Sequence, residues 1–411
     1  MIKVNRATLS NGLRIIHNYD SATAMVALNI LYNVGARDED PEMTGLAHLF
    51  EHLMFGGSAN IPDFDAAIED AGGWNNAWTS NDFTNFYDVL PAHNAETAFW
   101  LESDRMLSLA FSDKALEVQR NVVIEEFKQV CLNKPYGDMG HHLRSLIYTT
   151  HPYRFPVIGK EFSHIERVTQ EDVRNFFHAH YAPNNAVLAI SGHISWEETL
   201  RLANKWFGDI PRRDIAPRLY QPEPQQTAPR TKTVSGNVPQ TALTITFPMP
   251  GYGSPKYIPC DIITDLLAAG RSARFYQNLL MGTELFTEVD ASISGSEEPG
   301  YLILSAKLRE NTPDAIARAQ EAMIEQALSL ADGSLTEYEL TRAINRYESN
   351  YTFGSISFLA KAQALALSEM HDEDINSTVP RYRSVTVDDI IDTTRSIIDP
   401  QRASTLIYTP A

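Results

Sequence analysis

Three polar side chains lie close together in the stretch Gly45–Ser58, which reads GLAHLFEHLMFGGS. His48, Glu51 and His52 form the pattern His-x-x-Glu-His within it. Because an α-helix advances about 100° per residue, a helix here would hold all three side chains within about 100° of arc. The two imidazoles, one turn apart, could then bind a single metal ion. Glu51, beside them, could act as the general base that takes a proton from a metal-activated water.

Zinc is the metal that this set of side chains favours. Catalytic zinc binds neutral imidazoles and keeps one coordination position for water. The pattern inverts the commoner His-Glu-x-x-His motif, although a half-buried helix with two solvated histidines would give the same letters. A third protein ligand is also required. The segment RNVVIEEFKQ offers Glu125 and Glu126, and spacing alone does not decide between them.

The surrounding sequence predicts the elements that would position these groups. Asn11-Gly12 between two apolar runs indicates a hairpin, and Met25–Arg37 reads as a buried strand. Apolar residues recur at helical spacing from Leu46 to Phe55, which supports a helix for the histidines. Asp63 is a candidate N-cap of a second helix. The following residues, WNNAWTSNDFTNFYDVLP, alternate polar and aromatic side chains and therefore predict strands.

A proline-rich segment divides the chain nearly in half. The stretch IPRRDIAPRLYQPEPQQTAPRTKT contains five prolines and few large aliphatic residues, which is typical of a linker. Strands, a helix, strands and two long helices, around Pro313–Leu330 and Leu335–Met370, are expected after it. This order parallels the first half and indicates a duplicated α+β unit. We therefore expect a metal-bearing domain at 1–210, a linker at 211–230 and a homologous domain without the metal motif at 231–411.

Composition narrows the classes of function. The formal net charge of −18 disfavours binding to nucleic acid or to an anionic membrane. Cys131 and Cys260 are the only cysteines, so a disulfide framework or cysteine zinc site is not expected. The sequence contains no run of about 18 apolar residues, so no membrane span is expected. The N-terminal residues do not resemble a signal peptide. A cytoplasmic location is expected, with a periplasmic one open if a leader was removed.

Several separated segments resemble the pitrilysin (insulinase-type) family of zinc metallopeptidases. They are GLAHLFEHLMFGGS, AGGWNNAWTSNDFTNFY, RNVVIEEF, HPYRFPVIG and HAHYAPNNAVLAISGHI, with a weaker similarity at LLAAGRSARFYQNL in the second half. The length and the two halves resemble the short-chain subfamily, which includes the mitochondrial processing peptidase and bacterial relatives. The resemblance implies an α+β fold of two homologous domains, each a mixed, mostly antiparallel sheet packed with helices, together forming half of a clamshell.

The resemblance also implies roles for individual residues. His48 and His52 match the two zinc ligands, Glu51 matches the catalytic base, and aligning RNVVIEEF puts Glu126 on the metal as third ligand. In this family the strand after the Gly-Gly turn binds the substrate as an added strand. Residues matching that strand are Asn76, Ala77 and Trp78, which would otherwise belong to an ordinary edge strand.

Two departures from the family pattern stand out. Gln119 occupies a position, seven residues before Glu126, where many members carry a glutamate; it can hydrogen-bond near the site but adds no charge. Catalytically complete members also have an arginine and, seven residues later, a tyrosine that bind the substrate carbonyl. The best alignment puts Phe358 and Leu365 at those two positions, and both side chains are apolar.

These features predict a zinc-dependent endopeptidase for short or unfolded peptides. The chain is expected to be the metal-bearing subunit of a heterodimer, whose homologous partner supplies the arginine and tyrosine. A homodimer, with the alignment displaced by a turn, is the alternative for the assembly. The alternative function is a non-catalytic structural subunit, as in the respiratory-complex core proteins, although a scaffold would not need His48, Glu51, His52 and Glu126 together.

Overall fold

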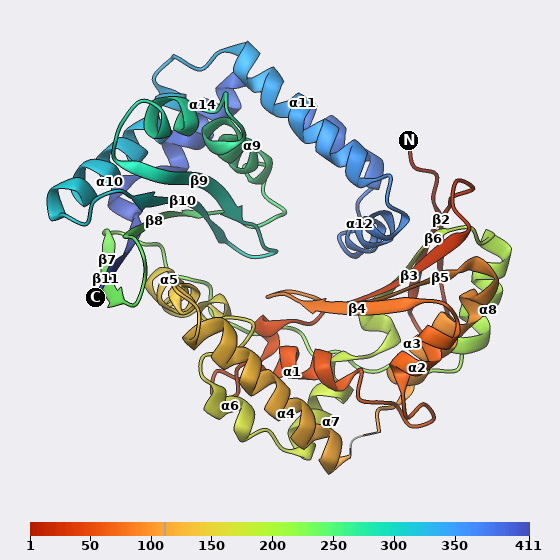
Figure 1. Cartoon of the computed structure of the whole chain (residues 1–411). Coiled ribbons are helices and arrows are strands. Elements are labelled where there is room, and N and C mark those ends of the chain that lie inside the picture. The colour runs from red at the N-terminus through yellow and green to blue at the C-terminus, as the bar shows by residue number, and fades with distance from the viewer. Residues whose placement is uncertain (111) are drawn as a thin grey trace. The chain divides into compact units, whose positions relative to one another are not determined.

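The computed structural model describes residues 1–110 and 112–411, which divide into two compact units, each discontinuous in sequence (Figure 1). Unit 1 comprises Met1–Phe127, Phe155–Tyr220 and Tyr351–Thr378. Unit 2 comprises Lys128–Arg154, Gln221–Asn350 and Val379–Ala411. These units differ from the continuous domains expected from the sequence. Residues 128–154 pack with the second half of the chain, and residues 351–378 pack with the first half. Residues 211–229, within the expected linker, contain no helix or strand.

The sheet of unit 1 has six strands in the order β1-β2-β6-β3-β5-β4. Strands β2 and β6 are parallel, and every other neighbouring pair is antiparallel. Strand β4 forms the edge of the sheet farthest from β1. The bounds are β1 (Asn5–Thr8), β2 (Arg14–Tyr19), β3 (Met25–Tyr32), β4 (Trp74–Thr79), β5 (Thr84–Pro91) and β6 (Ala186–Gly192).

Both faces of this sheet are covered by helices. The central strands β3 and β6 are almost continuously buried, as near-continuous apolar runs predict for a sheet covered on both sides. Helix α12 (Phe358–Met370) covers one face, across β2, β3 and β6. The main core of unit 1 lies on the other face. Helices of that core include α1 (Leu46–Leu53), α2 (Phe64–Asp70), α3 (Ala95–Leu107), α4 (Asp113–Phe127), α6 (Phe162–Glu166), α7 (Gln170–His180) and α8 (Trp196–Phe207).

Local signals at two of these elements agree with the sequence. Asp63 is the N-cap of α2, and its side chain accepts a hydrogen bond from the Ala66 amide. The hairpin between β1 and β2 turns at Gly12, which has a φ of 92° that favours glycine.

The long helix expected at Leu335–Met370 is instead two helices, α11 (Glu337–Gly354) and α12. Ser357 caps α12 by accepting from the Ala360 amide, so the chain starts a new helix there.

The sheet of unit 2 has five strands in the order β7-β11-β8-β10-β9. Its strands are β7 (Arg230–Gly236), β8 (Ala242–Met249), β9 (Phe286–Ser294), β10 (Gly300–Leu308) and β11 (Ser404–Pro410). Strands β7 and β11 are parallel, and the other pairs are antiparallel. The remaining α-helices of the described residues are α5 (Met139–Ile147), α9 (Tyr257–Ala268), α10 (Pro313–Leu328), α13 (Thr378–Arg383) and α14 (Val387–Ile397).

The two sheets repeat one topology. Reading outward from the parallel pair, β2-β6-β3-β5-β4 of unit 1 corresponds to β7-β11-β8-β10-β9 of unit 2. In each unit a helix, α1 or α9, follows the central strand and contacts the far edge strand. The expected fold class, two homologous α+β domains with mostly antiparallel sheets, is confirmed. Across the residues described, no helix is both long enough and apolar enough to span a bilayer.

Candidate metal centre

Helix α1 presents the His-x-x-Glu-His pattern on its polar face. Leu46, Leu49 and Phe50 are buried in the core of unit 1, so the opposite face carries the two histidines and Glu51. The helix N-terminus is held by Glu39, a half-buried carboxylate that accepts hydrogen bonds from two backbone amides. These amides belong to Gly45, at 2.8 Å, and Ala47, at 2.7 Å. Glu39 thus satisfies donors that a helix leaves unpaired at its N-terminus.

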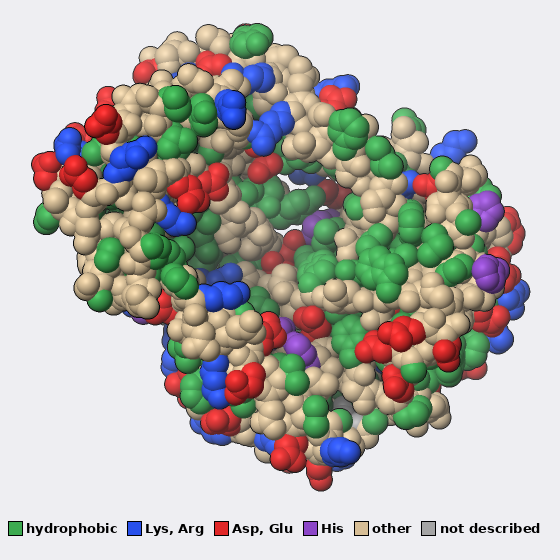
Figure 2. Space-filling view, in the orientation of Figure 1, with side chains coloured by type: hydrophobic (Ala, Val, Ile, Leu, Met, Phe, Trp, Pro, Cys, Tyr) green, Lys and Arg blue, Asp and Glu red, His purple; other side chains and the backbone are tan. Residues whose placement is uncertain are grey.

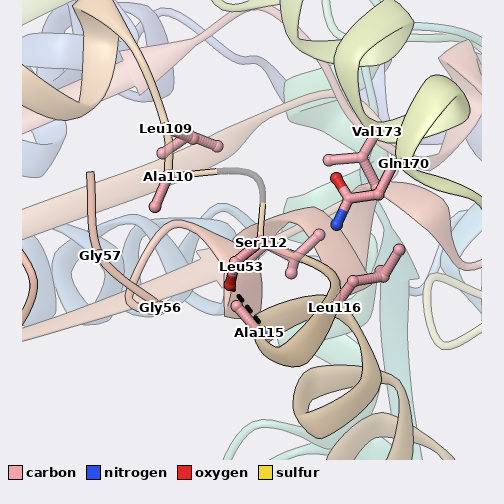
Figure 3. Close-up of a pocket in the computed structure, with 10 residues that line it drawn as sticks. All are labelled: Leu53, Gly56, Gly57, Leu109, Ala110, Ser112, Ala115, Leu116, Gln170 and Val173. Atoms are coloured by element: carbon pink, nitrogen blue, oxygen red, sulfur yellow. Dashed lines mark hydrogen bonds between the residues drawn. The ribbon is translucent and has the colours of Figure 1, made fainter. Parts of the chain in front are cut away.

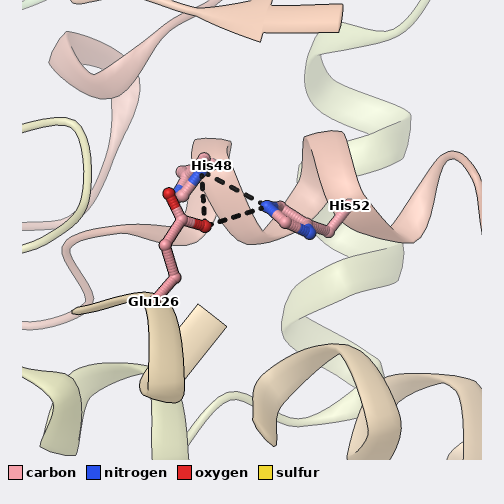
Figure 4. A group of neighbouring side chains, drawn as sticks. All are labelled: His48, His52 and Glu126. Atoms are coloured by element: carbon pink, nitrogen blue, oxygen red, sulfur yellow. Dashed lines mark hydrogen bonds and ion pairs between the residues drawn. The ribbon is translucent and has the colours of Figure 1, made fainter. Parts of the chain in front are cut away.

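Helix α4 packs against α1 and brings in a carboxylate (Figure 4). Val123 and Phe127 of α4 are buried, which turns Glu126 toward the histidines, whereas Glu125 is exposed. The Glu126 Oε2 atom lies 3.7 Å from His48 Nε2 and 3.5 Å from His52 Nε2. The two Nε2 atoms lie 3.3 Å apart. Within the described residues, this is the one group of three or more such side chains close enough to hold a metal ion.

The dimensions of this triangle fit zinc. Ligand atoms about 2.0–2.2 Å from a tetrahedral zinc ion are separated by about 3.4 Å, and the three edges here measure 3.3, 3.5 and 3.7 Å. Burial lowers the pKa of His48 to about 4 and also lowers the pKa of His52. Both imidazoles are therefore neutral at neutral pH, the form in which histidine binds a metal. The donor set and its spacing suit a zinc ion with an open fourth position.

Glu51 lies beside the triangle without belonging to it. Its Oε2 atom accepts a hydrogen bond of 2.5 Å from the hydroxyl of Thr79, at the end of β4. Burial raises the pKa of Glu51; the bond from Thr79 opposes this shift, and the charge of Glu126 adds to it. A carboxylate whose pKa is raised toward neutrality is suited to exchange protons with a reacting group.

The residues matched to the family's substrate strand lie on β4, which contacts α1. The backbone amide of Ala77 donates to the side chain of Asn76, 2.8 Å away, so it is not used in pairing with β5. Ala77 packs toward the main core, and Trp78 packs toward the face covered by α12. Hydrophobic side chains gather on the surface over β4 (Figure 2). Trp74, on this strand, is 49% exposed.

The positions that depart from the family pattern also have defined surroundings. Gln119 is half-buried on α4, the helix of Glu126. Leu365 is fully buried between α12 and the sheet. Phe358, the first residue of the same helix, packs with Ala27 and Val89 of the sheet. Leu365 is thus a core residue of unit 1, and Phe358 is a half-buried residue packed against the sheet.

Two residues at the centre were missed by sequence reasoning: Glu39 and Thr79. A signal for Glu39 exists, because an acidic residue shortly before a helix can cap its N-terminal amides. Thr79 belonged to the predicted strand, but strand alternation shows only that it shares a face with Ala77. Its pairing with Glu51 depends on how α1 lies against β4.

A small pocket lies at the C-terminal end of α1 (Figure 3). It is formed where the loop after α1 meets the starts of α4 and α7. Its polar lining includes Ser112 and Gln170, and the side-chain oxygen of Gln170 is buried without a hydrogen-bond partner. The described lining residues include no acid, base or metal ligand. Among the described residues, the lining is formed by Leu53, Gly56, Gly57, Leu109, Ala110, Ser112, Ala115, Leu116, Gln170 and Val173.

Comparisons with known proteins agree with this fold. The family model described as "Insulinase (Peptidase family M16)" matches residues 14–159, and "Peptidase M16 inactive domain" matches residues 167–347. The chain belongs to the insulinase (M16) family of peptidases. The resemblance found in the separated motifs is therefore confirmed.

Several proteins to which the chain is similar are bacterial proteins named as proteases. It is 26% identical over 347 residues to the "Zinc protease PqqE" of Helicobacter pylori, covering 83% of this chain and 77% of that protein. A crystal structure of a protease from Helicobacter pylori superposes with a TM-score of 0.93 at 23% identity, covering all of both chains. The periplasmic protease PqqL from Escherichia coli superposes with a TM-score of 0.81 at 17% identity. That match covers 99% of this chain but 47% of PqqL.

Proposed function

We propose that the protein is a zinc-dependent endopeptidase that hydrolyses short or unfolded peptides. The triangle of His48, His52 and Glu126, with Glu51 beside it, is the observation that carries this proposal. A peptidase needs a metal site with an open position and a base next to it. The relatives named as zinc proteases support the same activity.

Each residue of the centre has a distinct part in this reaction. His48, His52 and Glu126 would hold the zinc ion, which supplies Lewis-acid polarisation and a lowered pKa for coordinated water when it is bound. Glu51 takes a proton from the attacking water at its carboxylate. It then passes that proton to the nitrogen of the departing amine. Gln119, on the helix that carries Glu126, offers an uncharged amide near the site.

The peptide would bind along the edge strand β4. An edge strand presents backbone groups that a substrate in extended conformation can pair with. Asn76, Ala77 and Trp78 would contribute the contacts, and pairing would require the Asn76 side chain to release the Ala77 amide. This arrangement favours unfolded segments, because a folded protein does not offer a free strand.

A second chain of the same fold would complete the catalytic site. At the positions matched to the carbonyl-binding arginine and tyrosine, Leu365 is buried in the core of unit 1 and the half-buried Phe358 packs against the sheet. The chain aligns with about half of the longer PqqL chain, which supports an assembly of two such halves. We propose a heterodimer in which the homologous subunit supplies the arginine and tyrosine; a homodimer is the alternative.

The test is peptide hydrolysis by the zinc-loaded chain, alone and mixed with a homologous chain encoded beside it. An unstructured basic peptide is the substrate, and cleavage is followed by mass spectrometry. Activity confined to the mixture supports the split site, whereas full activity of the chain alone supports a homodimer. Glu51→Gln should leave only a small residual rate of cleavage in either case, lower by about 10³-fold or more, with Glu125→Gln on the exposed surface of α4 as matched control. If Glu51→Gln cleaves as fast as wild type in the active assembly, the peptidase proposal is wrong.

A further inference from the structure

The hydroxyl of Thr79 joins the edge strand to the general base. Thr79 is the last residue of β4, and its Oγ1 donates to Glu51 Oε2 at 2.5 Å. Both side chains are half-buried. A hydrogen bond to a carboxylate in such surroundings is short and about twice as strong as one between neutral groups. Glu51 therefore has a fixed partner on the strand where a peptide would pair.

The turn after Thr79 is anchored firmly. The Ser80 amide donates to the Phe83 carbonyl at 2.8 Å, which closes the β4–β5 turn. The Ala36 amide donates to the Ser80 carbonyl at 3.0 Å. Arg37 and Asp82 form a buried ion pair of 2.8 Å. Residues of the connection between β3 and α1 thus hold the end of β4.

The same connection holds the helix that carries Glu51. Glu39, two residues after Arg37, accepts hydrogen bonds from the Gly45 and Ala47 amides at the start of α1. One short segment, residues 35–39, is therefore tied both to the hairpin that ends in Thr79 and to the helix of Glu51. This arrangement fixes the distance between the threonine hydroxyl and the glutamate carboxylate.

We propose that Thr79 is a positioning residue that orients the Glu51 carboxylate and assigns different tasks to its two oxygens. Oε2 is held by the threonine hydroxyl, and Oε1 is left to take the proton. In that step an O–H bond of the attacking water breaks and an Oε1–H bond forms, so the proton is transferred without an additional reactant. This inference rests on the proposed peptidase function.

Loss of the correct orientation of Glu51 should lower the turnover rate rather than weaken substrate binding. A glutamate without its partner can rotate among several side-chain conformations, of which few aim Oε1 correctly. We expect Thr79→Val, which keeps the shape and removes the hydroxyl, to lower kcat about 10- to 100-fold with KM changed less than about twofold. Thr79→Ser, which restores the hydroxyl, should recover most of the rate.

Matched controls separate positioning from a general structural effect. Thr287→Val removes a hydroxyl from edge strand β9 of unit 2 and should leave kcat unchanged. Zinc content, by atomic absorption, and the urea midpoint should be alike in wild type and Thr79→Val. If Thr79→Val folds poorly, Thr79→Ala serves as the second variant for the same measurements.

A double substitution gives the decisive comparison. Because Thr79 acts through Glu51, Thr79→Val should cause no further loss of kcat in a Glu51→Gln background. An equal loss in both backgrounds, or a wild-type kcat for Thr79→Val, would overturn the inference. These outcomes are distinct from failure of the proposed function, in which Glu51→Gln itself would retain wild-type activity.

Discussion

His48 and His52 direct their Nε2 atoms at each other across 3.3 Å. Burial lowers the pKa of both imidazoles, so both rings are neutral at neutral pH. Two neutral rings can share one proton between these nitrogens, or both can donate lone pairs to a metal ion. Glu126, with Oε2 within 3.7 Å of both, adds the negative charge that a divalent ion would neutralise.

Zinc should therefore stabilise the folded protein. A ligand present at about 100 times its dissociation constant adds about 2.7 kcal/mol to the free energy of unfolding. We expect stabilisation of this order when zinc is added to chelator-treated protein, measured by urea unfolding. His52→Ala should remove the effect, and His141→Ala, on α5 of unit 2, should not. Equal zinc stabilisation of wild type and His52→Ala would contradict the site.

Adjacent glutamates on α4 should respond very differently to substitution. Glu126→Gln removes a charged ligand and should weaken zinc binding by more than about tenfold. Glu125→Gln, one residue away on the exposed side, should change it less than about twofold. Competition with a chromogenic chelator measures both affinities. The reverse result would assign the third ligand to Glu125.

Introducing arginine at position 358 and tyrosine at position 365 should not create activity in the isolated chain. Leu365 is fully buried against the sheet, and truncating a buried leucine costs about 2–5 kcal/mol. We expect Leu365→Ala to lower the free energy of unfolding by that amount. The pair Phe358→Arg with Leu365→Tyr should lower it further without creating activity in the isolated chain. Phe353→Ala, at a side chain that is 69% exposed, should change stability by less than about 0.5 kcal/mol. Activity gained by the double variant would show that these positions do face the substrate.

A histidine outside the metal centre should make stability depend on pH. His17 is fully buried, its Nε2 lies 2.8 Å from the Ile194 carbonyl, and burial lowers its pKa. The unfolded chain therefore binds a proton at His17 below about pH 6.5, where the folded protein does not. The unfolded state then holds more protons, so stability rises with pH up to about 6.5 and falls below it.

The contribution of His17 is isolated by comparing two pH series. Urea unfolding of the zinc-free protein at pH 5, 6, 7 and 8 should show stability falling toward acid, since other buried histidines contribute as well. The loss between pH 7 and 5 should be smaller for His17→Gln than for wild type. Identical slopes would mean that His17 titrates normally in the folded state.

Local features of the centre could be read from the sequence, whereas spatial ones could not. The pattern of His48, Glu51 and His52 lies within two helical turns, so helix geometry alone places the side chains together. Choosing Glu126 over Glu125 needed the family resemblance, because both belong to one helix whose packing was unknown. Thr79 was not predicted, since no periodicity relates a strand residue to a helix before it in the chain.

In the fold, too, local features could be predicted from the sequence and contacts between distant residues could not. Strand alternation and turn residues predicted the hairpin at Gly12 and the cap at Asp63, both of which depend on neighbours in sequence. The break between α11 and α12 was missed, because apolar spacing continues through it. That α12 covers the sheet of unit 1 depends on contacts between residues far apart in the chain. Propensities and short-range patterns do not carry such information.

The position of α12 affects how the protein can be made. During translation, the last strand of the unit 1 sheet ends at Gly192, yet α12 begins at Phe358. At typical synthesis rates the ribosome needs on the order of ten seconds for the residues between them. For that time the sheet surface around Ile16, Leu31 and Val187 has no α12 to cover it. A nascent chain in this condition is a substrate for chaperones, and a gene fragment that stops in the proline-rich segment would encode a permanently unfinished metal-binding half.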